Sequence, residues 1–160
     1  PIGAVPISLA NFVICLTAWL LGPKFGTLSV VIYLVLGAIG IPVFSGYGAG
    51  LAKLAGPTGG YLVGYLLLAF IGGMFIEKSK GNPVISAVGL VLGDAACYVL
   101  GTAWFVFQMQ CELGYALTVC VYPFIALDLA KIVVSCIVGA LLRKRLTQAG
   151  VLKLQNAVSE

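Results

Sequence analysis

Histidine is absent from this 160-residue sequence, and charged residues of either sign are scarce. Without histidine, the chain lacks the commonest metal ligand and the usual general base near neutral pH. Only 9% of its residues are charged, whereas a soluble domain has about 25%. Five carboxylates and nine Lys or Arg side chains could not cover the surface of a soluble globule of this size. We therefore expect neither a water-soluble fold nor a bound metal ion.

Apolar residues are in excess: they make up 61% of the chain and give it a mean hydropathy of +1.13. A helix needs about 20 apolar residues to cross the hydrocarbon core of a membrane. Five runs reach about that length, and they lack the period-two alternation of a transmembrane β-barrel. We predict an all-α polytopic transmembrane helical bundle, a single integral membrane domain over residues 1–160. Its five predicted spans are residues 5–21, 25–41, 58–76, 83–107 and 123–142.

Lys and Arg residues are unevenly distributed between the ends of these spans. Alternate ends carry seven of them, whereas the opposite ends carry only Lys53; the seven are Lys24, Lys78, Lys80, Arg143, Lys144, Arg145 and Lys153. Short loops rich in Lys and Arg stay in the cytoplasm. We therefore expect a cytoplasmic tail over residues 143–160 and extracellular loops over residues 42–57 and 108–122.

Five spans with a cytoplasmic C-terminus put residue 1 outside the cell. A chain without a cleavable signal at that end would more naturally begin inside. We therefore expect one further helix before residue 1, absent from this sequence by truncation, and six spans in the full-length protein.

Three ionisable residues fall well inside the predicted spans: Asp94, Asp128 and Lys131. A charge at the centre of a transmembrane helix costs about 2.5–3.5 kcal/mol on insertion scales, so such residues usually face a cavity or one another. Asp128 and Lys131 share one helix face, as Asp94 and Tyr98 do. At about 1.5 Å per residue, Tyr98 and Lys131 lie at a similar depth. The four side chains form either an ion pair that only joins two helices or a polar binding pocket.

A carboxylate beside an ammonium places a hydrogen-bond acceptor a few ångströms from a donor. This arrangement suits a ligand with adjacent N–H and C=O groups, such as an amide or a urea. Both charges would then keep partners when the ligand replaces water, which limits the cost of desolvation. We therefore favour the binding pocket over the purely structural ion pair.

The glycine-rich segment over residues 40–61 ends in a turn that leads into a helix. Thr58 is the candidate N-cap of that helix. The N–H groups of Thr58, Gly59, Gly60 and Tyr61 would be free at the positive end of the helix, where a carboxylate binds well. We predict a carboxylate-binding turn that needs no cationic side chain.

The first part of the same segment, residues 40–50, is predicted to be a mobile lid. Its aromatic residues Phe44 and Tyr47, together with Tyr61, offer rings to the apolar body of a ligand; ordinary packing of a re-entrant loop is the alternative for each ring. The segment is not a nucleotide site. It lacks the G-K-[ST] ending of a P-loop, and its GYGAG follows a membrane helix rather than a strand.

Several motifs resemble those of the BioY family in order and spacing. They are VPISL, LLGPKFG, YLVLGAIGIPVFSGYGAG, GPTGGYLVGYLLLAFIGG, YVLGTAWF and YPFIALDLAKIVVSCIVGALLRKRL. Members of this family are the biotin-binding S-components of energy-coupling-factor (ECF) transporters. The resemblance implies six transmembrane helices, a bacterial plasma membrane location and biotin as the ligand. It implies no cofactor and no enzymatic activity of the chain itself. The implied partners are a transmembrane coupling subunit and two ATPase subunits, with no nucleic acid.

The resemblance also implies roles for individual residues. Asp128 would accept a hydrogen bond from a ureido N–H of biotin, and Lys131 would donate to the ureido carbonyl. The carboxylate of biotin would bind the turn at residues 58–61. Two positions depart from the family pattern: Ala10 stands where relatives often have glutamine, and Thr58 lies at a turn where some relatives have arginine.

Other functions remain open on the residues alone. A small proton-coupled carrier or channel would use Asp94, Asp128 and Lys131 as an intramembrane relay. A membrane enzyme such as an acyltransferase would need a nucleophile beside a base, which the sequence does not offer. A purely structural membrane subunit would bind no small molecule tightly.

Overall fold

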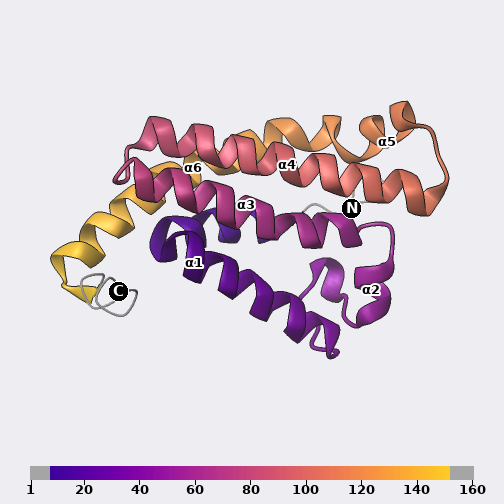
Figure 1. The fold of residues 1–160 in the computed structure, drawn as a ribbon, viewed down its shortest axis with the longest axis horizontal. Helices are drawn as coiled ribbons and strands as arrows, with labels where there is room; N and C mark the ends of the chain where they lie inside the picture. Colours follow the sequence, from indigo (N-terminus) through magenta and orange to yellow (C-terminus); the bar gives the residue numbers. More distant parts are fainter. Residues whose placement is uncertain (1–7, 152–160) are drawn as a thin grey trace.

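The computed structural model describes residues 8–151, and this part of the chain is a bundle of helices (Figure 1). It contains no strand, only an isolated bridge between Phe44 and Gly48. The predicted all-α class is therefore confirmed. The helices are α1 (Ala10–Ala38), η1 (Ser45–Tyr47), α2 (Leu51–Ala55), α3 (Gly59–Lys78), α4 (Pro83–Met109), α5 (Leu113–Cys120) and α6 (Tyr122–Gln148).

Helix α1 is two helical arms joined by a sharp break at Gly22. Gly22 has φ 72° and ψ −171°, a conformation open essentially only to glycine. Pro23 follows, and its fixed φ suits the first turn of the second arm. A Cβ atom on Gly26 would lie 3.5 Å from Cα of Ala18, although a straight helix would separate these residues by about 12 Å. The chain therefore folds back on itself where the sequence predicts a break.

Four helices in the described residues are long and apolar enough to cross a membrane: α1, α3, α4 and α6. The division of the first into two spans stays a prediction, as do the other predicted span limits. The predicted start at residue 5 and the end of the predicted tail lie outside the described residues. Helix α6 continues through residues 143–148, so the predicted tail begins as helix. The predicted loops contain short helices: η1 and α2 in residues 42–57, and α5 in residues 108–122.

Glycines allow α3 and α4 to pack closely along their length. A Cβ on Gly64 would lie 2.8 Å from Sγ of Cys97, and a Cβ on Gly93 would lie 3.0 Å from Cα of Leu68. Small residues let membrane helices approach each other in this way. The close contact fixes the relative position of the two helices that supply Tyr61, Asp94 and Tyr98.

The two ends of the bundle differ in charge. At one end lie the break in α1, the turn between α3 and α4, and the C-terminal end of α6 (the left of Figure 1). This end carries Lys24, Lys78, Lys80 and the basic residues 143–145. Helix α2, with Lys53, lies at the opposite end. Six of the seven cations that the sequence assigns to one side of the membrane therefore lie at the same end of the bundle, and the seventh, Lys153, lies outside the described residues.

Candidate functional site

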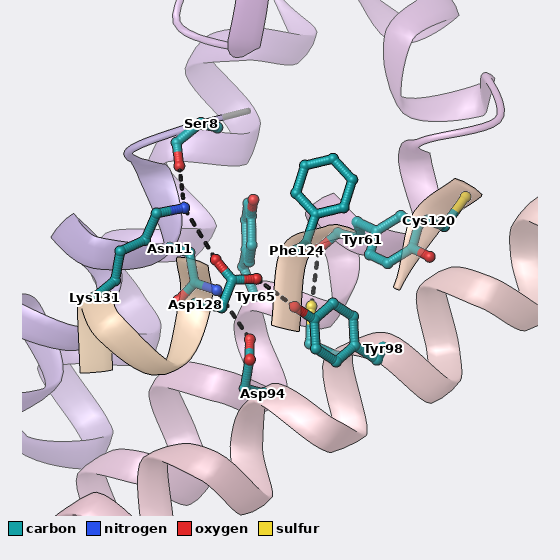
Figure 2. A pocket seen from close by; sticks show the side chains of 11 residues that line it. Ser8, Asn11, Tyr61, Tyr65, Asp94, Tyr98, Cys120, Phe124, Asp128 and Lys131 are labelled. Atoms are coloured by element: carbon teal, nitrogen blue, oxygen red, sulfur yellow. Dashed lines mark hydrogen bonds and ion pairs between the residues drawn. The ribbon is translucent and has the colours of Figure 1, made fainter. Parts of the chain in front are cut away.

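The centre of the candidate site is the ion pair between Asp128 and Lys131 on α6. Nζ of Lys131 lies 2.9 Å from Oδ1 of Asp128 and donates a second hydrogen bond, of 2.8 Å, to the carbonyl oxygen of Ser8. The hydroxyl of Tyr98, on α4, donates to Oδ2 of Asp128. Figure 2 shows these side chains pointing toward one another. The predicted convergence of Asp128, Lys131 and Tyr98 is therefore present in the fold.

Burial shields the Asp128–Lys131 pair from water. The side chains of Asp128 and Lys131 are only 8% and 15% exposed. Both oxygens of Asp128 accept a hydrogen bond, whereas among the described residues only two acceptors contact the ammonium of Lys131, which has three N–H donors. A ligand that replaces Ser8 or Tyr98 would meet an acceptor and a donor side by side.

Asp94 is the third charge of the site. It is buried on α4, and Oδ1 accepts a 2.9 Å hydrogen bond from Nδ2 of Asn11 on α1. Asn11 in turn accepts a weak hydrogen bond from Sγ of Cys15. Asp94 thus belongs to the same polar cluster as the ion pair, but its described partner is an amide rather than Lys131.

These groups surround a small cavity of about 60 Å³. Pockets that bind drug-sized ligands are usually about 300–1,000 Å³. The cavity is therefore large enough for water but not for a vitamin-sized molecule, so a ligand would have to displace side chains. The lining residues are Ser8, Asn11, Tyr61, Tyr65, Asp94, Cys97, Tyr98, Cys120, Phe124, Asp128 and Lys131 (Figure 2).

Three predicted aromatic residues lie in three different places. Tyr61 lines the cavity, and its hydroxyl is 2.9 Å from Oγ1 of Thr102. Phe44 is buried edge-on against Tyr33, in the wall of a separate cavity of about 460 Å³ between the two arms of α1. Tyr47 is 89% exposed. Phe44 and Tyr47 therefore do not line the small polar cavity, although Ser8 lines both cavities.

The turn at residues 56–61 differs from the predicted open anion site. The N–H of Gly59 donates to the carbonyl of Gly56, and the N–H of Tyr61 donates to the carbonyl of Thr58. Thr58 occupies the N-cap position, but its side chain makes no capping hydrogen bond. The prediction of four free N–H groups is therefore wrong for Gly59 and Tyr61. The physical reason is that the tight turn satisfies these donors with its own carbonyl groups.

Two side chains of α4 also hold this turn closed. Nε1 of Trp104 donates to the carbonyl of Gly56 at 2.9 Å, and Gln108 donates to the carbonyl of Ala55. Gly60 packs so tightly on Trp104 that a Cβ would lie 2.3 Å from the Cβ of the tryptophan. Gly59 and Gly60 are buried and do not line the polar cavity.

Several lining residues were not predicted. Tyr65, Cys97 and Phe124 lie three or four positions from Tyr61, Asp94 and Asp128, so helical spacing could have identified them. Asn11 is a polar residue inside an apolar run, the signal that identified Asp94. No sequence signal marked Cys120, because it comes from α5, a helix within a predicted loop. Burial raises the pKa of its thiol, so Cys120 is neutral at pH 7.

Comparison with known proteins gives a consistent result. Residues 1–148 match the model of the BioY family. The biotin transporter BioY of Thermotoga maritima is 40% identical over 144 residues, which cover 90% of this chain and 84% of the relative. The probable biotin transporter BioY of Pyrococcus horikoshii is 37% identical over 138 residues, covering 86% of this chain and 80% of that protein.

A solved structure agrees in fold. The crystal structure of the S-component for biotin from an ECF-type ABC transporter superposes with a TM-score of 0.83 at 36% identity. The match covers 90% of this chain and 79% of that one. The match to the family model, the similar relatives and the shared helical fold show that this chain belongs to the BioY family.

Proposed function

We propose that this chain captures biotin in a membrane-embedded pocket and delivers it across the membrane as the S-component of an ECF transporter. The observation that supports this most strongly is the buried Asp128–Lys131 pair, with Tyr98 beside it, in a BioY family member. The ureido ring of biotin presents N–H and C=O groups side by side. Asp128 accepts from the N–H, and Lys131 donates to the carbonyl.

Binding exchanges internal hydrogen bonds for bonds to the ligand. The ureido carbonyl takes the place of the Ser8 carbonyl on Nζ of Lys131, and the ureido N–H takes the place of the Tyr98 hydroxyl on Asp128. Both charges therefore keep partners throughout, so the ligand does not leave a buried charge unpaired. Asn11 holds Asp94 in place as the third polar wall.

The small volume of the cavity supports a rearrangement on binding. Release of Ser8 from Lys131 removes a wall shared by the polar cavity of about 60 Å³ and the apolar cavity of about 460 Å³. The larger cavity already has the volume of a small-molecule site, and joining the two brings the polar groups of the smaller cavity to it. Phe44 then borders the enlarged site, and Tyr47 lies on the outer surface of the lid.

The carboxylate of biotin binds at the turn of Thr58, Gly59, Gly60 and Tyr61 once the turn loosens. The N–H groups of Gly59 and Tyr61 must first release the carbonyls of Gly56 and Thr58. Trp104 and Gln108, which donate to the carbonyls of Gly56 and Ala55, restrain this opening.

The bundle sits in the bacterial plasma membrane with its cation-rich end and its C-terminus in the cytoplasm, in keeping with the positive-inside rule. A transmembrane coupling subunit and two ATPase subunits supply the energy. The chain itself is a binding and transport component, not an enzyme.

Equilibrium binding of radiolabelled biotin to the detergent-solubilised full-length protein tests this function. Asp128→Asn and Lys131→Met each remove a charge-assisted hydrogen bond worth about 1.5–3 kcal/mol, so affinity should fall at least tenfold. Lys78→Gln, an exposed cation at the far end of α3, is the matched control and should bind like the wild type. Wild-type affinity in both site variants would refute the proposed ureido site. Uptake driven by a proton gradient without ATPase subunits would instead indicate the relay of Asp94, Asp128 and Lys131.

A further inference from the structure

A third cavity, of about 560 Å³, lies at the cation-rich end of the bundle. Its basic lining residues come from two elements: Lys80 from the turn between α3 and α4, and Arg143 and Lys144 from the end of α6. Lys80 and Gly81 both have positive φ, at 54° and 81°, and this pair turns the chain back toward α4. The turn therefore faces the end of α6, as Figure 1 also shows.

The cations of this cavity lack acidic partners in the described part of the chain. No acidic residue lines the cavity, and no described carboxylate lies within 4 Å of Lys80, Arg143 or Lys144. Arg143 is half-buried, and its Nη1 lies 3.5 Å from the carbonyl of Trp19. Lys80 and Lys144 are exposed, so water and salt screen part of the repulsion among the three cations, and an anion among them would remove the rest. The positive-inside rule explains why cations are at this end, but not why three of them share a cavity.

An apolar groove begins about one helical turn from the basic cavity. It has a volume of about 520 Å³ and runs between α4 and α6, starting at Pro83 and Val84. Gly81 and Pro83 are two residues apart, and Ile137 of the groove is three residues from Ala140 of the basic cavity. One helical turn rises about 5.4 Å. A cationic cavity and an apolar groove are thus neighbours along two helices.

We infer that this surface binds one anionic phospholipid, with its phosphate among Lys80, Arg143 and Lys144 and an acyl chain in the groove between α4 and α6. Basic pockets between membrane helices favour anionic headgroups because both Coulomb attraction and N–H donors act on the phosphate. The groove distinguishes a lipid from free phosphate, which would use the cations alone. The inference does not depend on biotin recognition, because the polar cavity shares none of these residues.

Native mass spectrometry tests the inference. The full chain is mixed in detergent with phosphatidylglycerol or with phosphatidylcholine of identical acyl chains, and the lipid that remains bound after release from the detergent is counted. The wild type should retain one phosphatidylglycerol in preference to phosphatidylcholine. Lys80→Gln and Arg143→Gln should each weaken that retention about fivefold, the effect of one cation near an anionic lipid. Arg143→Lys, which keeps the charge, should retain more lipid than Arg143→Gln.

The controls are cations at the same end that do not line the cavity: Lys24→Gln and Lys78→Gln should retain phosphatidylglycerol like the wild type. Equal losses in these controls would overturn the inference, because they would indicate a diffuse charge effect. Val88→Trp fills the groove and should weaken lipid retention without altering any cation. If Val88→Trp has no effect and inorganic phosphate displaces the lipid, the cavity binds soluble phosphate and the lipid assignment is wrong.

Discussion

Replacing Lys131 by methionine should destabilise the bundle as well as weaken ligand binding. Methionine keeps the apolar stem of the side chain but removes the ammonium that lies 2.9 Å from Asp128. The Asp128 carboxylate, only 8% exposed, then keeps the hydroxyl of Tyr98 but loses its cation. Removing one partner of a buried ion pair costs about 3–5 kcal/mol.

The spacing of the pair lowers this figure slightly. Asp128 and Lys131 are three positions apart on α6, so the ion pair can persist after the helices of the bundle separate. In that unfolded state, a solvated pair at this spacing still contributes about 0.2–0.5 kcal/mol, which is subtracted from the cost of losing the buried pair. The expected net loss is therefore about 2.5–5 kcal/mol. At about 2–4 °C for each kcal/mol in a chain of this size, the melting temperature should fall by about 5–20 °C.

A double-mutant cycle separates loss of charge pairing from loss of packing. The melting temperatures of Asp128→Asn, Lys131→Met and the double variant are measured in one detergent without ligand. Because the double variant leaves no unpaired charge, it should be more stable than the sum of the single losses predicts, by about 1–3 kcal/mol. Additive losses, or an unchanged melting temperature in Lys131→Met, would refute the view that the two charges depend on each other in the folded protein.

Three further variants test the fold around the site by melting temperature or proteolysis. Gly64→Ala puts a Cβ 2.8 Å from Sγ of Cys97 and should lower the stability of the fold by about 1–3 kcal/mol. Its control is Gly114→Ala, whose Cβ would have no atom within 4 Å and which should cost no stability. Equal effects of the two variants would argue against close packing of α3 on α4. Gly22→Ala forces alanine to φ 72° and should lower the stability by about 1–3 kcal/mol. The control Gly26→Ala in the same helix makes only ordinary van der Waals contacts and should have little effect. An unchanged stability of Gly22→Ala would count against the break in α1. Trp104→Phe removes the 2.9 Å hydrogen bond to the carbonyl of Gly56, which is worth about 0.5–1.5 kcal/mol. Protease cleavage within residues 51–58 should therefore become faster, by up to about tenfold. An unchanged cleavage rate would mean that Trp104 does not hold the turn.

The sequence predicts the long helices well because their apolar runs are long and their ends are marked. Gly22 and Pro23 mark the break in α1, and Pro83 and Pro123 lie in the first turns of α4 and α6. Helix α5 has no comparable mark. It is only eight residues long, and its residues alone could equally form a loop.

The polar cluster could be predicted because charges inside apolar helices are costly and so demand partners. That rule identifies Asp128 and Lys131, and helical spacing brings in Tyr98. It does not reveal the Ser8 carbonyl as a partner of Lys131, because every residue has a backbone carbonyl and the sequence does not show which one faces the ammonium. The state of the turn at residues 56–61 was equally hidden: whether its N–H groups are free depends on how tightly the chain turns.

The proposed recognition of the ureido carbonyl by Lys131 can be tested by exchanging one atom of the ligand. The affinity of biotin is compared with that of an analogue whose ureido oxygen is replaced by an N–H group, for the wild type and for Lys131→Met. At pH 7 the guanidino group of the analogue is protonated, so in the wild type it places N–H donors and a positive charge against the Lys131 ammonium. Biotin should therefore bind the wild type at least tenfold more tightly than the analogue, and this preference should be lost or reversed in Lys131→Met, where the Asp128 carboxylate has no cation. If Lys131→Met prefers biotin as strongly as the wild type does, Lys131 does not contact the ureido carbonyl and the proposed site is wrong.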